Sequence, residues 1–233
     1  MRKWIRRISL AVVVCGIAAC AWYGVQNYLA NQREAQAGVA IKPSIPDGER
    51  VIDFDELRMR NEDIVAWLEI GGTGIDHPVV QGRDNDYYLG TDVNRRASKF
   101  GALFLDFRVR ADFSDFNSVI YGHHIRNNTR MFHDLVLFKD KAFFDWYRTG
   151  TLYTPARTIP FEIFAVALTD PYAQYYRYDI LTPGQREDYL DYIKESAMHY
   201  RDIGVGIQDH VLILSTCSYE FEDARTLVAA KLS

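Results

Sequence analysis

The chain has 233 residues, of which 48% are hydrophobic and 14% aromatic, enough to bury one substantial core but few for two full domains. The formal net charge is -4 and the basic residues are scattered. This charge pattern lacks the electrostatic footprint of a nucleic-acid-binding protein, so we exclude nucleic acid as a partner and expect one globular domain.

The N-terminal segment has the composition of a membrane anchor. Residues 1–7 are basic, and residues 8–30 then carry no charge and are rich in Ala, Val, Ile and Leu. A helix of that length can cross a hydrocarbon core of roughly 30 Å. Basic residues hold their end of the span in the cytoplasm, so the remainder is expected outside the cell. The sequence predicts a cytoplasmic segment at 1–7, a transmembrane anchor at 8–30 and an extracellular domain.

Two other interpretations of this segment remain open. A cleaved signal peptide shares the basic start and the apolar middle. Residues 17–20, which end at Cys20, also resemble the cleavage box of a lipoprotein. The apolar character continues through Trp22, Tyr23 and Val25, which favours a retained span. All three interpretations export the domain.

The rest of the chain reads as a linker and one domain. Residues 31–50 contain Gly38, Pro43, Pro46 and Gly48 and indicate a linker, which leaves 51–233 as the domain. Strands are expected at 64–70, 76–80, 102–108, 118–123, 151–154, 161–169, 210–216 and 226–232. Helices are expected at 53–63, 131–137 and 139–148, and from the N-cap Thr182 to about Tyr200. This pattern predicts a mainly β fold, a barrel or sandwich with helical insertions.

Cys217 is the first candidate for chemistry. Of the three cysteines, Cys15 and Cys20 lie in the apolar run, so the exported part holds Cys217 alone. An unpaired cysteine outside the cell indicates a reactive thiol or intermolecular pairing. Cys217 ends the apolar run 211–214 at a strand end, where a core meets a cleft. A small buried hydrophobic role remains the alternative.

A reactive thiol needs a base and a group that stabilises an oxyanion. Among the six histidines, His123 and His124 follow the apolar segment 118–122 at another strand end. Arg225 directly precedes the last strand, and a short loop would return it to the same end of the sheet as Cys217. Arg stays charged and presents a planar fork of donors. A solvated histidine and a surface ion pair of Arg225 are the alternatives.

Together these motifs resemble the sortase family. The similarity rests on Leu214-Ser215-Thr216-Cys217, on Arg225 before a final strand and on Tyr121-Gly122-His123 far upstream, and it covers residues 53–232. Class B is favoured by the helix before the first strand, the long helix before the cysteine strand, and the segments 78–81, 85–89 and 131–132. One departure is His124, where many class B members have Asn.

The resemblance implies a closed β-barrel of about eight strands with an N-terminal helix and a helical insertion before the cysteine strand. It implies a surface transpeptidase that cleaves a C-terminal sorting signal after Thr through a Cys thioester. The acyl protein then passes to an amine of the peptidoglycan cross-bridge or of a pilin. Cys217 matches the nucleophile, His123 the acid/base and Arg225 the oxyanion stabiliser. No metal or organic cofactor is required.

Four further residues are candidates for substrate binding. Tyr176 belongs to the Tyr-rich segment 170–178, which can form a wall of the site or cover the core beneath the long helix. Ser215 and Thr216 can bond the substrate or cap the strand end. Glu220 is expected to orient Arg225 through a charge-assisted pair.

Other classes remain as rivals. A secreted papain-like protease would place its cysteine before its histidine, whereas here the order is reversed. A non-enzymatic adhesin would leave Cys217 without a role. A zinc site made from His123, His124 and His133 lacks an acidic or thiol ligand at the usual spacing.

Overall fold

The computed structural model describes residues 22–23, 25–26, 50–125 and 130–233. The chain divides into two compact units, with the second spanning Ile52–Ser233. Apart from residues 22–23 and 25–26, the predicted anchor lies outside the described residues, as does the predicted linker except for Arg50. Across the part of the chain that is described, no helix is both long and apolar enough to cross a membrane.

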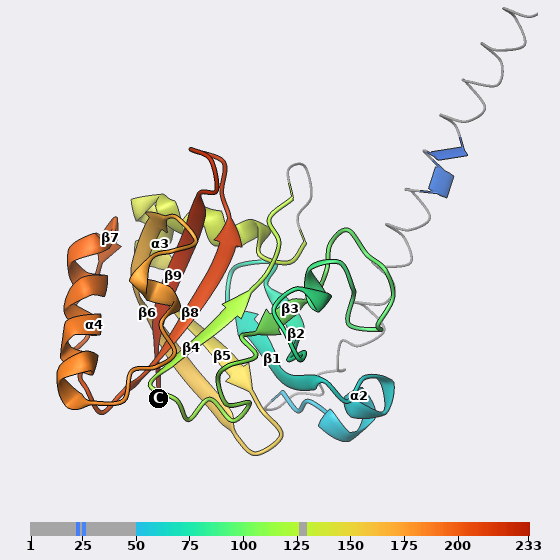
Figure 1. Cartoon of the computed structure of the whole chain (residues 1–233), viewed down its shortest axis with the longest axis horizontal. Helices are drawn as coiled ribbons and strands as arrows, with labels where there is room; N and C mark the ends of the chain where they lie inside the picture. The colour runs from blue at the N-terminus through green and yellow to red at the C-terminus, as the bar shows by residue number, and fades with distance from the viewer. Residues whose placement is uncertain (1–21, 24, 27–49, 126–129) are drawn as a thin grey trace, which may run out of the picture. The chain divides into compact units, whose positions relative to one another are not determined.

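The described part of the second unit contains one mixed sheet that closes into a barrel (Figure 1). Its strands are β1 (Ile64–Ile70), β2 (Asp76–Val80), β3 (Leu103–Leu105), β4 (Asn117–Tyr121), β5 (Thr149–Tyr153), β6 (Thr158–Thr169), β7 (His199–Tyr200), β8 (His210–Cys217) and β9 (Arg225–Leu232). The order is β5-β1-β2-β3-β4-β8-β9-β6-β7, and pairing of β5 with β6 closes the barrel. β7 is thus an additional edge strand, and the predicted mainly β barrel is confirmed.

Short helices decorate the barrel. They are α2 (Phe54–Arg60), η1 (Tyr87–Leu89), η2 (His133–Lys139), α3 (Lys141–Trp146), η3 (Gln174–Tyr176) and α4 (Pro183–Ser196), where η denotes a 3-10 helix. α4 begins as predicted, because the Thr182 side chain accepts from the Gln185 backbone N–H and the Gln185 side chain accepts from that of Thr182 in return. These two bonds fix the start of α4, the helical insertion that precedes β8.

The apolar run of β8 is explained by burial on both faces of the strand. Leu212 and Leu214 pack into the barrel interior, whereas Val211 and Ile213 belong to a second core. That second core includes Tyr189 of α4, so α4 covers the outer face of the sheet (Figure 1). A strand buried on both sides reads as a continuous apolar run. Cys217 is therefore the partly exposed last residue of a strand, and the strand residues directly before it are buried.

Several predicted boundaries were wrong, and for two of them the structure shows a local reason. The predicted strand 102–108 ends at Leu105 because the carboxylate of Asp106 accepts from the backbone N–H and guanidinium of Arg108 and turns the chain. The predicted strand 118–123 ends at Tyr121. The predicted helix 131–137 is instead the 3-10 helix η2. α4 stops at Ser196, before Tyr200, because the Met198 N–H bonds to the Val166 carbonyl and starts β7.

Candidate active site

Strand pairing brings Cys217 and Arg225 together. β8 and β9 are antiparallel neighbours, and Cys217 lies directly opposite Arg225 in their register. The Ser218 N–H donates to the Ala224 carbonyl over 2.8 Å, which continues the ladder into the connecting loop. Directly opposite residues present their side chains to the same face of a sheet. The loop thus returns Arg225 to the position predicted for it.

β4 and β8 run parallel, which brings His123 to the same rim of the barrel. Tyr121 pairs with Ser215, and the Thr216 hydroxyl donates to the Gly122 carbonyl over 2.6 Å. A Cβ on Gly122 would lie 2.3 Å from Leu103, so only glycine fits between the strand end and the core. The backbone past Gly122 is thereby held beside the end of β8.

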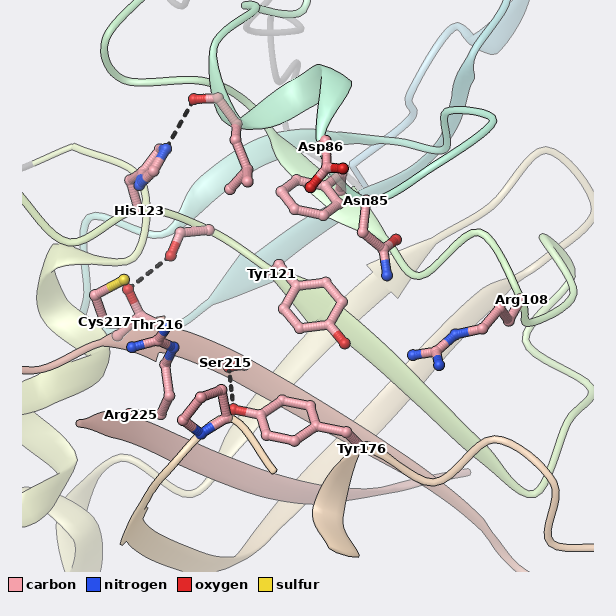
Figure 2. A pocket seen from close by; sticks show the side chains of 14 residues that line it. Asn85, Asp86, Arg108, Tyr121, His123, Tyr176, Ser215, Thr216, Cys217 and Arg225 are labelled. Atoms are coloured by element: carbon pink, nitrogen blue, oxygen red, sulfur yellow. Dashed lines mark hydrogen bonds between the residues drawn. The ribbon is translucent and has the colours of Figure 1, made fainter. Parts of the chain in front are cut away.

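The His123 imidazole and the Cys217 thiol line the same cavity and influence each other's charge. Their interaction is the main cause that raises the pKa of His123 and lowers that of Cys217. Burial opposes both shifts, while the charge of Arg225 further lowers the pKa of the thiol. On its other side, His123 Nε2 lies 2.8 Å from the Leu89 carbonyl oxygen (Figure 2). Each of the two side chains therefore favours the charged form of the other.

His124 faces elsewhere. Its Nδ1 donates to the backbone carbonyl of Cys217 over 3.2 Å, and its ring centroid lies 5.2 Å from that of His133. Burial, with smaller contributions from His133 and Lys139, lowers the pKa of His124. Only His123 of the two lines the cavity beside Cys217. In the described residues, no group of three His, Cys, Asp or Glu side chains is arranged to hold a metal ion.

The Arg225 guanidinium is held by backbone rather than by an acid. Its Nη1 donates to the carbonyls of Asp223 and Ala224 over 2.9 and 3.1 Å. Glu220, expected to orient it, instead accepts from Lys139 and Ser218. Glu220 also lies outside the cavity lining. Glu220 therefore holds the loop between Cys217 and Arg225 and does not pair with Arg225, which lines the cavity.

A cavity of about 470 Å³ lies over the three side chains (Figure 2). The predicted binding residues Tyr176, Ser215 and Thr216 line it, and the Tyr176 hydroxyl lies 3.0 Å from Ser215 Oγ. Further lining residues, not singled out individually from the sequence, are Asn85, Asp86, Leu89, Phe104, Arg108 and Pro171. Phe104 comes from β3 and Arg108 from the turn after it, and three of the six come from segment 85–89, whose only sequence signal was its place in the class B pattern.

Both interpretations of the Tyr-rich segment apply, each to different residues. Tyr175 is 1% exposed and belongs to the core beneath α4. Tyr176 lines the cavity and stacks on Tyr121, with ring centroids 6.0 Å apart and an interplanar angle of 12°. Tyr121 in turn stacks on Phe104. One wall of the cavity is therefore a rigid row of aromatic rings.

Comparison with known proteins identifies the family. Residues 68–233 match the family model of the sortase domain. Sortase B of Listeria monocytogenes is 33% identical over 188 residues, which cover 80% of this chain and 76% of that protein. The crystal structure of Clostridium perfringens sortase B superposes with a TM-score of 0.74 at 34% identity, covering 78% of this chain and 100% of that one.

A third relative is a Streptococcus pyogenes class B sortase involved in pilus biogenesis. It is 33% identical, with a TM-score of 0.71, and the match covers 78% of this chain and 98% of that one. Sequence and fold agree over the barrel that carries the cavity. The chain belongs to the sortase family of transpeptidases and, within it, to class B.

Proposed function

We propose that this sortase works through Cys217 as nucleophile, His123 as acid/base and Arg225 as oxyanion stabiliser. The observation that supports this most is the meeting of the three side chains at one rim of the barrel, in one cavity. Cys217 lies opposite Arg225 in the strand register and shares the cavity with His123, whose interaction with the thiol lowers the pKa of Cys217. A nucleophile needs a base in hydrogen-bond contact and a donor for the developing charge.

The first half-reaction forms a thioester. The Cys217 thiolate attacks the carbonyl carbon of Thr in the sorting signal, and the carbonyl electrons move to oxygen. Arg225 holds that oxyanion with its fork of N–H donors. As the C–N bond breaks, the His123 imidazolium gives its proton to the leaving amine. The acyl protein is then joined to Cys217 Sγ, and His123 is neutral.

The second half-reaction transfers the acyl group. An incoming amine attacks the thioester carbon while neutral His123 takes a proton from it, and Arg225 again holds the oxyanion. Breaking the C–S bond releases the new amide and restores the thiolate and imidazolium. Water reacts in the same way but more slowly, which gives hydrolysis. No step requires a metal or an organic cofactor.

The cavity supports a short, partly apolar peptide as substrate. Stacked rings of Phe104, Tyr121 and Tyr176 offer a flat wall for proline, while Ser215 adds a hydroxyl to the lining beside Tyr176. We propose exported proteins with a Pro-containing C-terminal sorting signal as donors. The acceptor is an amine of the peptidoglycan cross-bridge or of a pilin, and the relative involved in pilus biogenesis makes the second acceptor specific enough to test.

We also propose that residues 8–30 anchor the enzyme in the membrane with the domain outside. The support is the uncharged segment after a basic start in the sequence. Such an anchor would keep the cavity near substrates that emerge at the cell surface. Extraction of cells with carbonate, followed by mass spectrometry of the N-terminus, tests it, because an anchored chain stays in the membrane pellet with residues 8–30 intact, whereas a cleaved chain has lost them.

Mass spectrometry tests the chemistry. The purified full chain is incubated with a library of Pro-containing sorting pentapeptides, alone, with triglycine, or with a lysine peptide. We expect a thioester adduct on Cys217 without amine, and an amide product when one amine is present. A cleavage product with no adduct on Cys217, formed equally by the Cys217→Ala chain, would contradict the proposal. The preferred amine separates cell-wall anchoring from pilus assembly.

A further inference from the structure

The orientation of His123 depends on a backbone carbonyl. His123 Nε2 lies 2.8 Å from the oxygen of Leu89, the last residue of η1. A carbonyl oxygen has no proton to give, so the ring nitrogen in this contact carries the hydrogen. Nε2 is therefore the proton-bearing nitrogen, and Nδ1 is left for the Cys217 thiol on the other side of the ring (Figure 2).

We propose that Leu89 is a positioning residue whose carbonyl serves as the third member of the catalytic set. It fixes the Nε2–H tautomer of His123 and stabilises the imidazolium, so that Nδ1 exchanges the proton with Cys217 and with the substrate amine. The role is that of the group that orients the base in a nucleophile–base pair, here filled by backbone instead of a carboxylate. The inference rests on the proposed role of His123.

The carbonyl is held in place before any substrate binds. Three successive carbonyls at this turn have separate partners: that of Tyr88 accepts from the Ala102 N–H over 3.0 Å, and that of Gly90 from the Ser98 N–H over 2.9 Å. The Leu89 carbonyl between them accepts from His123. The two outer bonds fix the plane of the turn, so the Leu89 carbonyl already points at the His123 ring before substrate binds.

The side chain of Tyr88 connects this turn to the residues that follow α2. Tyr88 is fully buried, and its hydroxyl donates to Asp63 over 2.6 Å and accepts from Asn61 over 2.9 Å. Burial and the bond to Asp63 raise the pKa of Tyr88 to about 12, so the hydroxyl keeps its proton in this contact. The turn is therefore fixed to the α2 end of the domain through a neutral, fully bonded phenol.

Gly101 provides the way to move the carbonyl. Its φ is +59°, and a Cβ there would lie 2.4 Å from the Tyr88 oxygen, 2.9 Å from the Leu89 oxygen and 3.1 Å from His123 Cδ2. Alanine at this position must push the turn away from the ring. Gly90 gives a matched control in the same turn, because its φ is −115° and a Cβ there meets nothing within 4 Å.

The bond to Leu89 also bears on pH. It adds to the rise in the pKa of His123 that the thiol contact causes, since a carbonyl binds an imidazolium more strongly than a neutral ring. The other charged groups on the cavity wall are Asp86, Arg108 and Arg225, and the neighbouring His124 turns to the Cys217 carbonyl and His133. A weaker carbonyl should thus lower the pH at which His123 loses its proton.

Weakening the acceptor alone tests the inference. Glycolic acid in place of Gly90 converts the Leu89–Gly90 amide of the full chain to an ester, whose carbonyl is a poorer acceptor. An ester at Gly71–Gly72, outside the cavity lining, is the control. We expect the Leu89 ester to lower kcat roughly 3- to 10-fold with KM unchanged, and to move the high-pH limb of kcat to lower pH. Gly101→Ala should lower kcat on the order of 10²-fold, and Gly90→Ala should not.

Nitrogen NMR of histidine-labelled chain reads the tautomer directly, with His123 assigned by comparison with His123→Gln. We expect Nε2 to bear the single ring proton at pH values high enough for the imidazole to be neutral. A proton on Nδ1, or an ester chain with wild-type kcat and pH profile, would overturn the role of Leu89. If the wild-type chain itself forms no Cys217 adduct, the proposed function fails instead.

Discussion

The site has two halves that are built in different ways. Cys217 and Arg225 form the strand half, where the β8–β9 register places them opposite each other. His123 and the Leu89 carbonyl form the loop half, where turns after β4 and before β3 must meet. A register fixes two residues at once, because slipping it by one would turn every buried side chain outward. A loop contact instead depends on many separate bonds, and so it is easier to perturb without unfolding the barrel.

Removing one member from each half should have the largest effect. We expect Cys217→Ala and His123→Ala each to lower kcat/KM by about 10⁴-fold, and the double variant to be little worse than either, because the two act as a unit. Peptide turnover followed by chromatography measures this. Losses that multiply in the double variant would mean that the two side chains work independently, which would contradict their action as a pair.

Arg225 probes the strand half alone. Arg225→Ala should lower kcat on the order of 10²- to 10³-fold, about 2.7–4 kcal/mol of transition-state stabilisation, because the oxyanion loses its charged donor. Arg225→Lys keeps the charge but not the planar fork, so we expect only partial recovery. If the effect of Arg225→Ala falls on KM and leaves kcat unchanged, Arg225 binds the peptide and does not stabilise the oxyanion.

The two halves should also differ in how strongly they lower the pKa of the Cys217 thiol. The His123 contact is the main cause that lowers the pKa of Cys217, and the charge of Arg225 contributes less. Alkylation of the Cys217 peptide by iodoacetamide across pH should therefore show a midpoint below the ordinary thiol value of 9.0. In His123→Ala the midpoint should rise, and alkylation at neutral pH should slow by roughly tenfold. Arg225→Ala should raise it less, and the reverse ranking would contradict the geometry.

The same division explains what the sequence could predict. β8 and β9 were predicted to within one residue, because a strand buried on both faces leaves a continuous apolar run that ends where Cys217 begins the rim. With both strands placed, the position of Arg225 followed. His123 was found as a polar residue after a glycine at a strand end, which again depends on the period of a strand.

The loop half could be predicted only in part. The Leu89 carbonyl has no side-chain signal, and its direction depends on the buried bonds of Tyr88 to Asn61 and Asp63, which are remote in the sequence. The pairing of Glu220 was predicted wrongly because proximity in sequence favoured Arg225, whereas the fold brings Lys139 from η2 beside it. Contacts between distant loops are set by tertiary packing, and no local pattern encodes them.

Glu220 offers a small perturbation of the strand half. Its carboxylate accepts from Lys139, from the Ser218 hydroxyl and, over 3.0 Å, from the Tyr219 N–H. Partial burial opposes ionisation, but the bonds to Lys139 and Ser218 outweigh it and lower the pKa of Glu220 to about 2. The acid therefore stays charged at working pH and ties the loop that follows Cys217 to η2. Arg225 is the first residue of β9 and directly follows that loop.

We expect Glu220→Gln to lower kcat a few-fold and the free energy of unfolding by less than about 1 kcal/mol, since the pair with Lys139 is partly exposed. Glu222→Gln is the matched control, because it makes the same change of charge in the same exposed loop without altering a described contact of Glu220. Peptide turnover and urea unfolding of the two variants separate the effects. Equal losses of kcat would mean that the charge of the loop matters and its fastening does not. A loss confined to Glu220→Gln would show that the register needs a fixed turn to aim Arg225.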